Sequence, residues 1–493
     1  MTAIAQRPPV FSTAPRNAAL AASLAIGSVF AGTAVAAGYG LEALGVAVFG
    51  SAVALAIHNW RWAVVGLLLY MPFSGLPVIA MYPHTTVALL VKDFLFVLPA
   101  YLGFLAVCHS RGASISFRGA PVVLLGMLAL LVVGQAFNPD LPNHLVGAIG
   151  TKVWLLYVPL YFLGYHLVRD KEHLRQIFGL MSLAAVPALT LGIVEALLVN
   201  GGHAQLVYRF YGNAAAATTQ NFAQFDFLGG GSIRRVSSTF SYGAQYYAFA
   251  VSMIVVSYGW LRLCTGRRSA GIARFVWLLA IAAALTSGLR GAIVFVPILI
   301  LLITLLERGR LPSAIGRLVA AAGVLLAALS VFHTPAGVLA SNVVHLGRQE
   351  FSDVFVHGFG HAFHLTILGL GTGADTGASR YALGHPSEFT GIGGTWYESW
   401  YVKAALELGI VGLILVALTL GAIFIGGRRA HRRLRDSALR GVSAALLAFV
   451  VWNFLYAIKS QYLDIDPMNV YFWVFAGIVT RLPSLERQGD EER

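Results

Sequence analysis

Positively charged residues stand at the ends of apolar runs in the second half of this sequence. Arg234 and Arg235 precede one such run, Arg290 interrupts another, and Lys403 follows a long loop. Membrane proteins concentrate Lys and Arg in cytoplasmic loops, so cations retained on the other side indicate a binding role. A guanidinium group donates two parallel hydrogen bonds to phosphate and always keeps its charge. We therefore predict a site for a lipid-linked phosphate or pyrophosphate, with Arg290 as its main residue.

Arginines on the outer face also have a second interpretation. They pair with nearby carboxylates, or their long side chains extend toward lipid headgroups. We prefer this interpretation for Arg209, Arg348 and Arg380. For Arg234, Arg235 and Arg290 we prefer phosphate binding, because these residues belong to the motifs described below.

Membrane-spanning helices must position these residues. Of the 493 residues, 58% are hydrophobic and 11% are charged, whereas soluble domains carry about 25% charged residues. The sequence therefore predicts an all-α, polytopic membrane helical bundle of about 14 transmembrane helices, each needing about 20 apolar residues. The predicted spans are 18–36, 39–57, 62–81, 86–107, 119–137, 147–167, 174–199, 239–261, 273–288, 291–306, 313–332, 397–425, 438–458 and 468–481.

Alternate loops carry most of the basic residues, and the positive-inside rule places these loops in the cytoplasm. The net charge of +13 is thereby explained by topology and does not indicate nucleic acid binding. Cys108 and Cys264 fall at predicted cytoplasmic helix ends, so no disulfide is expected. The predicted organisation is cytoplasmic tail 1–17, N-terminal helices 18–199, first periplasmic loop 200–238, central helices 239–332, large, partly helical periplasmic loop 333–396, C-terminal helices 397–481 and cytoplasmic tail 482–493.

Several segments of the second half together resemble a known family. They are Arg234–Phe240, Thr286–Ala292, Gly369–Gly373, Glu398–Tyr401 and Leu406–Leu413. In order, spacing and placement they are similar to motifs of the O-antigen ligase and polysaccharide polymerase superfamily. The resemblance covers about residues 232–481. Each short motif alone is weak evidence for the family, but the motifs occur here as a set.

The resemblance implies a glycosyltransferase of the bacterial inner membrane with a periplasmic active site. Ligases of the superfamily usually show His-Asn where this chain has Glu398-Ser399. We therefore expect a polymerase of exopolysaccharide, capsule or O-antigen, and the alternative is an O-antigen ligase that transfers glycan to lipid A-core. The implied partners are an undecaprenyl-pyrophosphate-linked oligosaccharide, the growing polysaccharide acceptor, membrane lipid, and chain-length regulator and export proteins.

The implied reaction assigns roles to individual residues. A sugar hydroxyl attacks the anomeric carbon and the pyrophosphate lipid leaves, so the protein must accept a proton and stabilise negative charge. We assign pyrophosphate binding to Arg290, Arg234 and Arg235, with Lys403 as a supporting cation. Glu398 is the candidate base, since burial beside an apolar helix raises a carboxyl pKa. The alternative for Glu398 is a structural ion pair with a cation such as Lys403.

Neighbouring residues complete this prediction. Tyr397, Trp400 and Tyr401 offer aromatic faces for sugar stacking, although aromatic residues at a membrane interface more often form an anchoring belt. His385 is the second choice for the base, because it is the histidine nearest to Glu398 in the large loop.

No metal and no cofactor is predicted. The Asp464-Ile465-Asp466 sequence resembles an Asp-x-Asp metal motif, but we expect it to close a helix end away from the large loop. His357, His361 and His364 share one face of a predicted helix, a spacing that permits metal binding. Because no cysteine or carboxylate cluster accompanies them, we prefer an interfacial helix.

Two other classes compete with a glycosyltransferase. A lipid-linked glycan flippase or another transporter would place charges deep in the bundle, as Lys92, Asp93, Lys152 and Glu195 suggest. A large outer loop argues against this class, because loops of such length are usually functional. The set of motifs argues against a purely structural scaffold.

Overall fold

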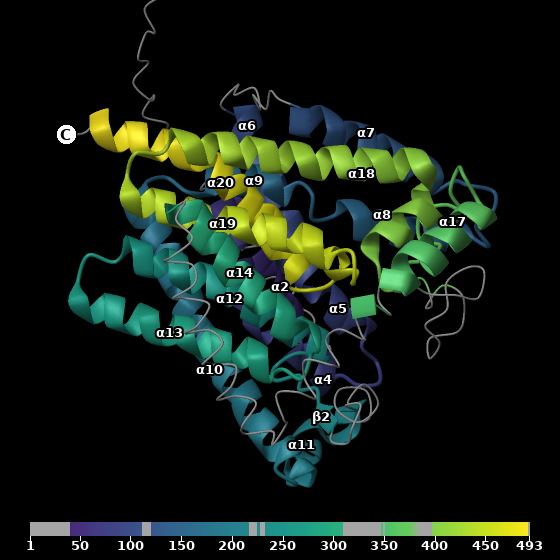
Figure 1. The fold of residues 1–493 in the computed structure, drawn as a ribbon, viewed down its shortest axis with the longest axis horizontal. Coiled ribbons are helices and arrows are strands. Elements are labelled where there is room, and N and C mark those ends of the chain that lie inside the picture. The colour runs from purple at the N-terminus through teal and green to yellow at the C-terminus, as the bar shows by residue number, and fades with distance from the viewer. Residues whose placement is uncertain are drawn as a thin grey trace, which may run out of the picture. The chain divides into compact units, whose positions relative to one another are not determined.

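The computed structural model describes residues 40–110, 120–215, 224–226, 232–308, 347–348, 351–377, 379, 382 and 397–491. Most of these residues are helical, as predicted, and the described strands form one short antiparallel pair (Figure 1). The chain divides into two compact units, Met1–Leu67 with Leu90–Ile115 and Leu68–Leu89 with Ser116–Arg493.

The first unit is a small helical layer. A Cβ atom added to Gly103 would lie 2.3 Å from the Ile57 carbonyl oxygen, so glycine permits this close helix contact. Trp60 packs edge-on against Phe104, with 5.0 Å between the ring centroids. Its described elements are α2 (Gly40–His58), the start of α3 (Trp60–Tyr70), the end of α5 (Thr86–Lys92), η2 (Asp93–Val97) and α6 (Leu98–Ser110).

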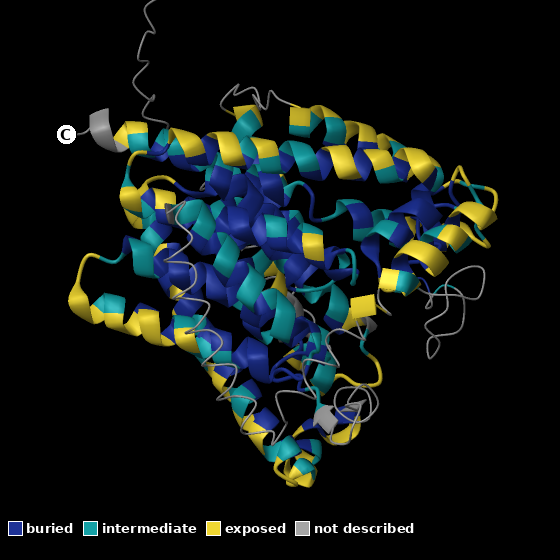
Figure 2. Ribbon diagram, viewed as in Figure 1, coloured by how far each residue is buried: buried dark blue, intermediate teal, exposed yellow. Residues whose placement is uncertain are grey.

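The second unit contains the remaining elements, which are η1 (Met71–Phe73), α4 (Leu76–Ala80), α7 (Ala120–Gln135), α8 (His144–Leu155), α9 (Leu160–Leu167), α10 (Lys171–Asn200), α11 (Ala204–Tyr211), η3 (Gly212–Ala214), β1 (Gln224–Asp226), β2 (Ser232–Arg234), α12 (Gly243–Leu263), α13 (Arg267–Thr286), α14 (Gly291–Arg308), η5 (Ser352–Gly358), α17 (Phe359–Leu365), α18 (Trp400–Arg433), α19 (Ser437–Tyr456), η7 (Tyr462–Asp464) and α20 (Met468–Glu491). Helices α12, α19 and α20 form its core, and Figure 2 shows them mostly buried. Glycines bring α20 against α9: a Cβ atom on Gly477 would lie 2.1 Å from the Tyr161 carbonyl oxygen. Such close approach is typical of helix packing in lipid.

Among the residues that the structure describes, seven helical segments are long and apolar enough to cross a membrane. They are Val87–Ser110, His144–Leu167, Lys171–Asn200, Gly243–Leu263, Arg267–Thr286, Trp400–Arg433 and Ser437–Tyr456. These helices confirm a helical membrane protein, whereas the predicted number of about fourteen spans is not confirmed. The predicted spans 18–36 and 313–332 lie outside the described residues.

The structure corrects one predicted helix and confirms one predicted break. A single span over 62–81 was wrong, because α3 ends at Tyr70 and only two short helices follow. Pro72 and Pro77 each lack the amide hydrogen that would continue the helix. The break between the two predicted spans near 288 is confirmed, since α13 ends at Thr286 and α14 begins at Gly291.

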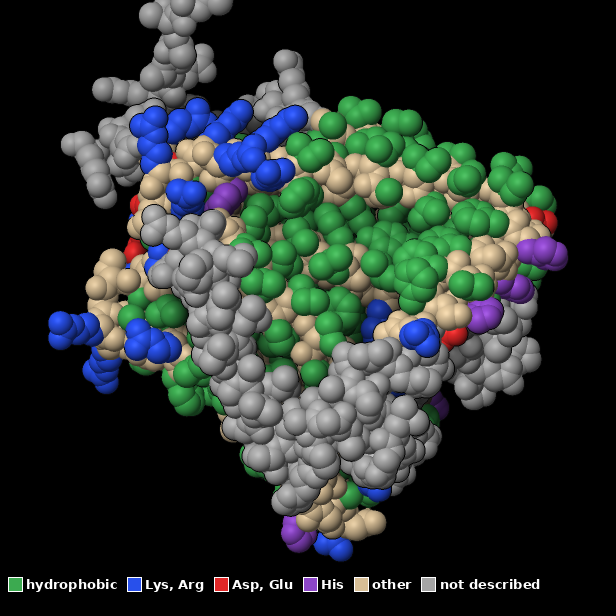
Figure 3. Space-filling view, viewed as in Figure 1, with side chains coloured by type: hydrophobic (Ala, Val, Ile, Leu, Met, Phe, Trp, Pro, Cys, Tyr) green, Lys and Arg blue, Asp and Glu red, His purple; other side chains and the backbone are tan. Residues whose placement is uncertain are grey.

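The basic loops of the second unit meet at one end of the helices. Lys171 Nζ lies 2.6 Å from Asp436 Oδ2, and Arg262 Nε lies 3.0 Å from Glu307 Oε1. The backbone amide of Asp436 also donates to Glu486. These contacts join the start of α10, the end of α12, the end of α14 and the start of α19. Figure 3 shows Lys and Arg gathered at the end where α18 finishes, as the charge pattern predicts.

Candidate functional site

At the opposite end of these helices, two of the predicted arginine motifs lie in backbone contact. The amide of Val236 donates to the carbonyl oxygen of Ser287 at 3.2 Å. Gly288 has φ +78°, and a Cβ atom there would lie 2.5 Å from the Arg234 carbonyl oxygen and 2.7 Å from the Arg235 Cα. We call the segments 234–238 and 287–291 the arginine turns. Only glycine tolerates both this conformation and this contact.

The side chains of the arginine turns have different surroundings. Arg234 Nη1 donates to the Tyr208 hydroxyl at 2.6 Å, and its backbone amide donates to Asn200 Oδ1 at 2.9 Å. The Nε atom of Arg235 is buried and has no hydrogen-bond partner among the described residues. Arg290 is half-buried. The structure thus brings together the turns that carry all three predicted phosphate-binding arginines.

A buried carboxylate holds the first arginine turn in place. Glu195 accepts a hydrogen bond from the Ser238 amide at 2.6 Å and another from the Ser237 amide at 3.4 Å. The Tyr211 hydroxyl lies 3.1 Å from Glu195 Oε2. Ser238 has φ +53°, an uncommon conformation for a residue other than glycine, which these bonds stabilise. Glu195 is therefore a structural anchor here, and not the free intramembrane charge that a transporter would use.

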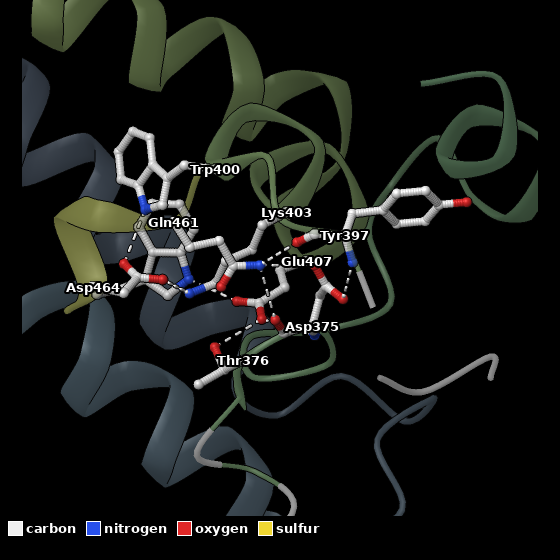
Figure 4. Close-up of polar contacts among 9 residues, drawn as sticks. Asp375, Thr376, Tyr397, Trp400, Lys403, Glu407, Gln461 and Asp464 are labelled. Carbon is white, nitrogen blue, oxygen red and sulfur yellow. Dashed lines mark hydrogen bonds and ion pairs between the residues drawn. The ribbon is translucent and has the colours of Figure 1, made fainter. Parts of the chain in front are cut away.

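A second polar cluster lies at the start of α18, which begins where Ser399 caps the helix by accepting from the Val402 amide. Lys403 is completely buried and forms an ion pair with Asp464. Trp400 Nε1 donates to Asp464 Oδ1 at 2.9 Å. We use the term acidic cluster for Asp375, Lys403, Glu407 and Asp464, which converge in Figure 4.

Glu407 lies one turn after Lys403 and is also completely buried. Its Oε2 accepts from Trp154 Nε1 at 2.6 Å. Its Oε1 accepts from the Asp375 amide and from Thr376 Oγ1, both at 2.9 Å. One carboxylate therefore joins α8, α18 and the loop that precedes α18.

Asp375 connects this cluster to the turn that starts α18. Its Oδ1 accepts from the Tyr397 amide at 3.4 Å, and its Oδ2 accepts from Gln461 Nε2 at 3.2 Å. Burial and the neighbouring Glu407 raise the pKa of Asp375 well above its ordinary value. Burial also raises the pKa of Asp464, although Lys403 opposes this shift. Since one ammonium group faces three carboxyl groups, repulsion between the carboxylates favours a protonated carboxyl group in the cluster.

Glycines shape the loop that supplies Asp375. Gly369, Gly371 and Gly373 have φ values of +101°, +103° and +101°, and Gly409 kinks α18 with φ +69°. The kink leaves backbone groups of α18 without hydrogen-bond partners inside the helix, and the loop supplies partners for them. The Gly371 amide donates to the Glu407 carbonyl oxygen at 3.2 Å. The glycine-rich sequence therefore allows the loop to pack closely against the kink and to form hydrogen bonds with its backbone.

The structure also places the other predicted residues. Glu398 is exposed, so the burial that we expected around this carboxylate is absent. Lys403 is enclosed and paired, which corrects the prediction that it supplies a cation to a ligand. The prediction that Asp464 lies away from the large loop was wrong, because it shares a cluster with Asp375 from that loop. His385 and Arg380 lie outside the described residues.

The aromatic residues near Glu398 mostly make structural contacts. Trp400 is buried with its indole nitrogen on Asp464, and the Tyr401 hydroxyl donates to the Phe454 carbonyl oxygen at 3.0 Å. Tyr397 is half-buried and packs against His361, with 5.9 Å between ring centroids. Of the three residues predicted to stack on sugars, Tyr397 and Tyr401 are half-buried and Trp400 is buried.

Two tyrosines lie between the arginine turns and the acidic cluster. A Cβ atom added to Gly291 would lie 2.9 Å from the Tyr456 hydroxyl. The rings of Tyr456 and Tyr462 have centroids 4.6 Å apart, and Tyr462 belongs to the same short helix as Asp464. Both clusters therefore occupy one end of α19.

The three loop histidines do not form a metal site. Within the described part of the chain, no group of three His, Cys, Asp or Glu side chains is placed to hold a metal ion. His357 Nδ1 lies 3.6 Å from Asp353 Oδ1, an exposed contact within one helix.

No protein-family model matches this sequence, and no curated protein matches it. Function must therefore be inferred from the chemistry of the two clusters.

The sequence pattern did not reveal the acidic cluster. Lys403 and Glu407 are four residues apart in an apolar helix, a spacing that places both charges on one face and is a usable signal. Nothing in the sequence links this face to Trp154, Asp375 or Gln461, since these residues come from distant segments.

Proposed function

We propose that this protein is a membrane glycosyltransferase of the polysaccharide polymerase type. It transfers an undecaprenyl-pyrophosphate-linked glycan to a sugar hydroxyl of the acceptor on the periplasmic face of a bacterial inner membrane. The observation that supports this best is the contact of Gly288 with Arg234 and Arg235, which gathers the arginine motifs at the end opposite the basic loops. Guanidinium groups carried on adjacent turns would suit a diphosphate.

The arginine turns would stabilise the leaving group. As the acceptor oxygen bonds to the anomeric carbon, the bond from that carbon to the pyrophosphate oxygen breaks and negative charge develops on the diphosphate. Arg290 and Arg235 would donate to it, while Arg234 is oriented by Tyr208. Donors held in place before the reaction lower the barrier because they need no reorganisation.

The acidic cluster would position the proton acceptor. Glu398 is our candidate to take the proton of the attacking hydroxyl. It lies on the turn between Tyr397 and Trp400, and these two residues are held by Asp375, Gln461 and Asp464 through hydrogen bonds. In this proposal Lys403 acts indirectly, because it neutralises the carboxylate that binds Trp400.

The proposal is tested with purified protein in vesicles that contain a lipid-linked oligosaccharide. Arg290→Ala should lower polymer formation by about 100-fold or more, the usual loss for one donor to a developing oxyanion. Arg268→Ala is the matched control, because Arg268 is an exposed arginine at the other end of the helices. Full activity of a stably inserted Arg290→Ala variant would refute the assignment.

Deletion of the gene separates the two transferase types. Loss of long surface polysaccharide with intact lipopolysaccharide is the result expected of a polymerase. Lipopolysaccharide without O-chains would instead identify a ligase, and unchanged glycans would exclude both.

A further inference from the structure

An apolar surface lies outside the seven candidate spans, between Phe351 and Leu368. Large hydrophobic side chains are exposed along this segment, to 61% at Phe351, 63% at Ile367 and 74% at Leu368. Further exposed members are Phe355, Val356, Phe363 and Leu365. Contiguous apolar patches of this kind mark contacts with proteins or membranes.

Helix periodicity sorts this segment into three stripes. Val354, Gly358 and Ala362 are buried, and this stripe packs on α18, where a Cβ atom at Gly358 would lie 3.0 Å from Val402. A second stripe is a stack of phenylalanine rings at every fourth position, with centroids 4.7, 5.9 and 6.0 Å apart. The stacked residues are Phe351, Phe355, Phe359 and Phe363.

Histidines form the third stripe, on the other flank of the buried one. In α17, His361 and His364 are about half a turn away from Phe359 and Phe363 around a helix with 3.6 residues per turn, and His357 lies in the π-helical turn before α17. His357 is exposed beside Asp353, and the His361 ring faces Tyr397. The segment is therefore amphipathic, with an aromatic flank and an imidazole flank.

The aromatic flank continues the apolar outer surface of two neighbouring helices. Ile367 accepts a hydrogen bond from the Ile410 amide of α18, and Leu368 accepts one from Gln135 at the end of α7. Apolar side chains are exposed toward this point on both helices, including Val411 and Ile414 on α18 and Val133 on α7, and Phe137 is exposed just after α7. In Figure 3, hydrophobic side chains run along α18 to the end where α17 lies.

We infer that residues 351–368 lie in the boundary of the lipid bilayer, with the phenylalanine stripe among acyl chains and the histidine stripe in water. The occupant of the apolar flank is phospholipid, because the patch is continuous with the outer faces of a candidate span and of a neighbouring apolar helix. Arg348 is exposed just before the segment, where its side chain reaches headgroup phosphates. This inference does not depend on the proposed enzymatic function.

Site-specific quenching tests this placement. In a Cys108→Ser, Cys264→Ser background, single cysteines replace Phe355, Leu368, His357 or His364, and each carries a bimane label. The labelled proteins are placed in vesicles of phosphatidylethanolamine and phosphatidylglycerol with or without brominated acyl chains. Ile414→Cys serves as the lipid control and Arg268→Cys as the aqueous control.

Brominated lipid should reduce fluorescence at positions 355 and 368 at least about twofold more than at 357 and 364, as expected for an interfacial helix. Aqueous iodide should show the reverse order. Strong iodide quenching at 355 and 368 would place the flank in water and overturn the inference. Weak quenching by both agents, with disulfide cross-linking between copies, would show that a second copy covers the flank. Leu365→Cys replaces a Phe355 or Leu368 variant that fails to elute as a folded species.

Discussion

Lys403 and Asp464 form an ion pair in the protein interior, with side-chain exposures of 0% and 10%. The pair joins the first turn of α18 to the short helix before α20, and Trp400 adds a hydrogen bond to the same carboxylate. Buried pairs of this kind contribute little net stability over apolar substitutes, but loss of one partner leaves an unpaired charge.

Lys403→Ala should therefore destabilise the protein by about 3–5 kcal/mol. The double substitution Lys403→Met with Asp464→Leu should recover part of this loss, since Asp464 is then no longer a buried charge without its partner, while Glu407 still lacks the Lys403 charge. Thermal unfolding of the detergent-solubilised protein measures both. Lys171→Ala is the matched control, because its pair with Asp436 is partly exposed and worth about 1 kcal/mol or less. Equal losses from the buried and the exposed pair would contradict this account.

The kink of α18 predicts that two glycines of this helix respond differently to substitution by alanine. Gly409→Ala forces a Cβ atom to within 2.5 Å of the Ile367 carbonyl oxygen in a backbone with φ +69°. It should destabilise the protein by about 1–3 kcal/mol or more, since the strain cannot relax locally. Gly421→Ala has open space around it and should be neutral or stabilising by up to about 1 kcal/mol. Melting temperatures of the two variants give the comparison, and a neutral Gly409→Ala would exclude a rigid kink.

Gly288 predicts an activity effect that is separate from stability. A Cβ atom at this position would push the arginine turns apart, and displacement of binding groups by about 1 Å can lower a rate by about 100-fold. Gly288→Ala should therefore lose most polymer formation in the vesicle assay while it remains inserted. Gly271→Ala in α13 meets no atom within 4 Å and is the control. Normal activity of Gly288→Ala would show that the contact between the turns is not needed.

The raised pKa of Asp375 predicts how stability depends on pH. Burial, and then the Glu407 charge, favour the protonated form in the folded state, while Lys403 opposes them. Because the folded-state pKa exceeds the unfolded value of about 3.9, this contribution is present below that value and is lost as pH rises through the folded pKa. The wild-type protein should thus lose stability with rising pH in this window.

Asp375→Asn should remove that part of the pH dependence, because an amide cannot ionise. Melting curves of wild type and variant, recorded from mildly acidic to alkaline pH, should show wild type losing stability relative to the variant as pH rises. Glu407, Asp464 and Lys403 face Asp375 and are present in both proteins, so only the difference between the curves reports Asp375. Parallel curves would mean that Asp375 does not change its protonation in this range.

The sequence alone determined the helical elements and the end at which the arginine turns lie. Long apolar runs have no other way to satisfy their backbone in lipid, so α10, α12 and α18 fall close to their predicted ranges. Alternation of loops then places Arg234 and Arg290 at the same end. The short, charged interruption near 288 ends one apolar run and precedes the next, so it separates α13 from α14.

Tertiary structure decided which polar groups meet. Glu407 binds Trp154 and Asp375 from segments far away in the sequence, and Lys403 binds Asp464. Buried charges take whichever partners helix packing brings within hydrogen-bond distance, and periodicity along one segment contains no information about these partners.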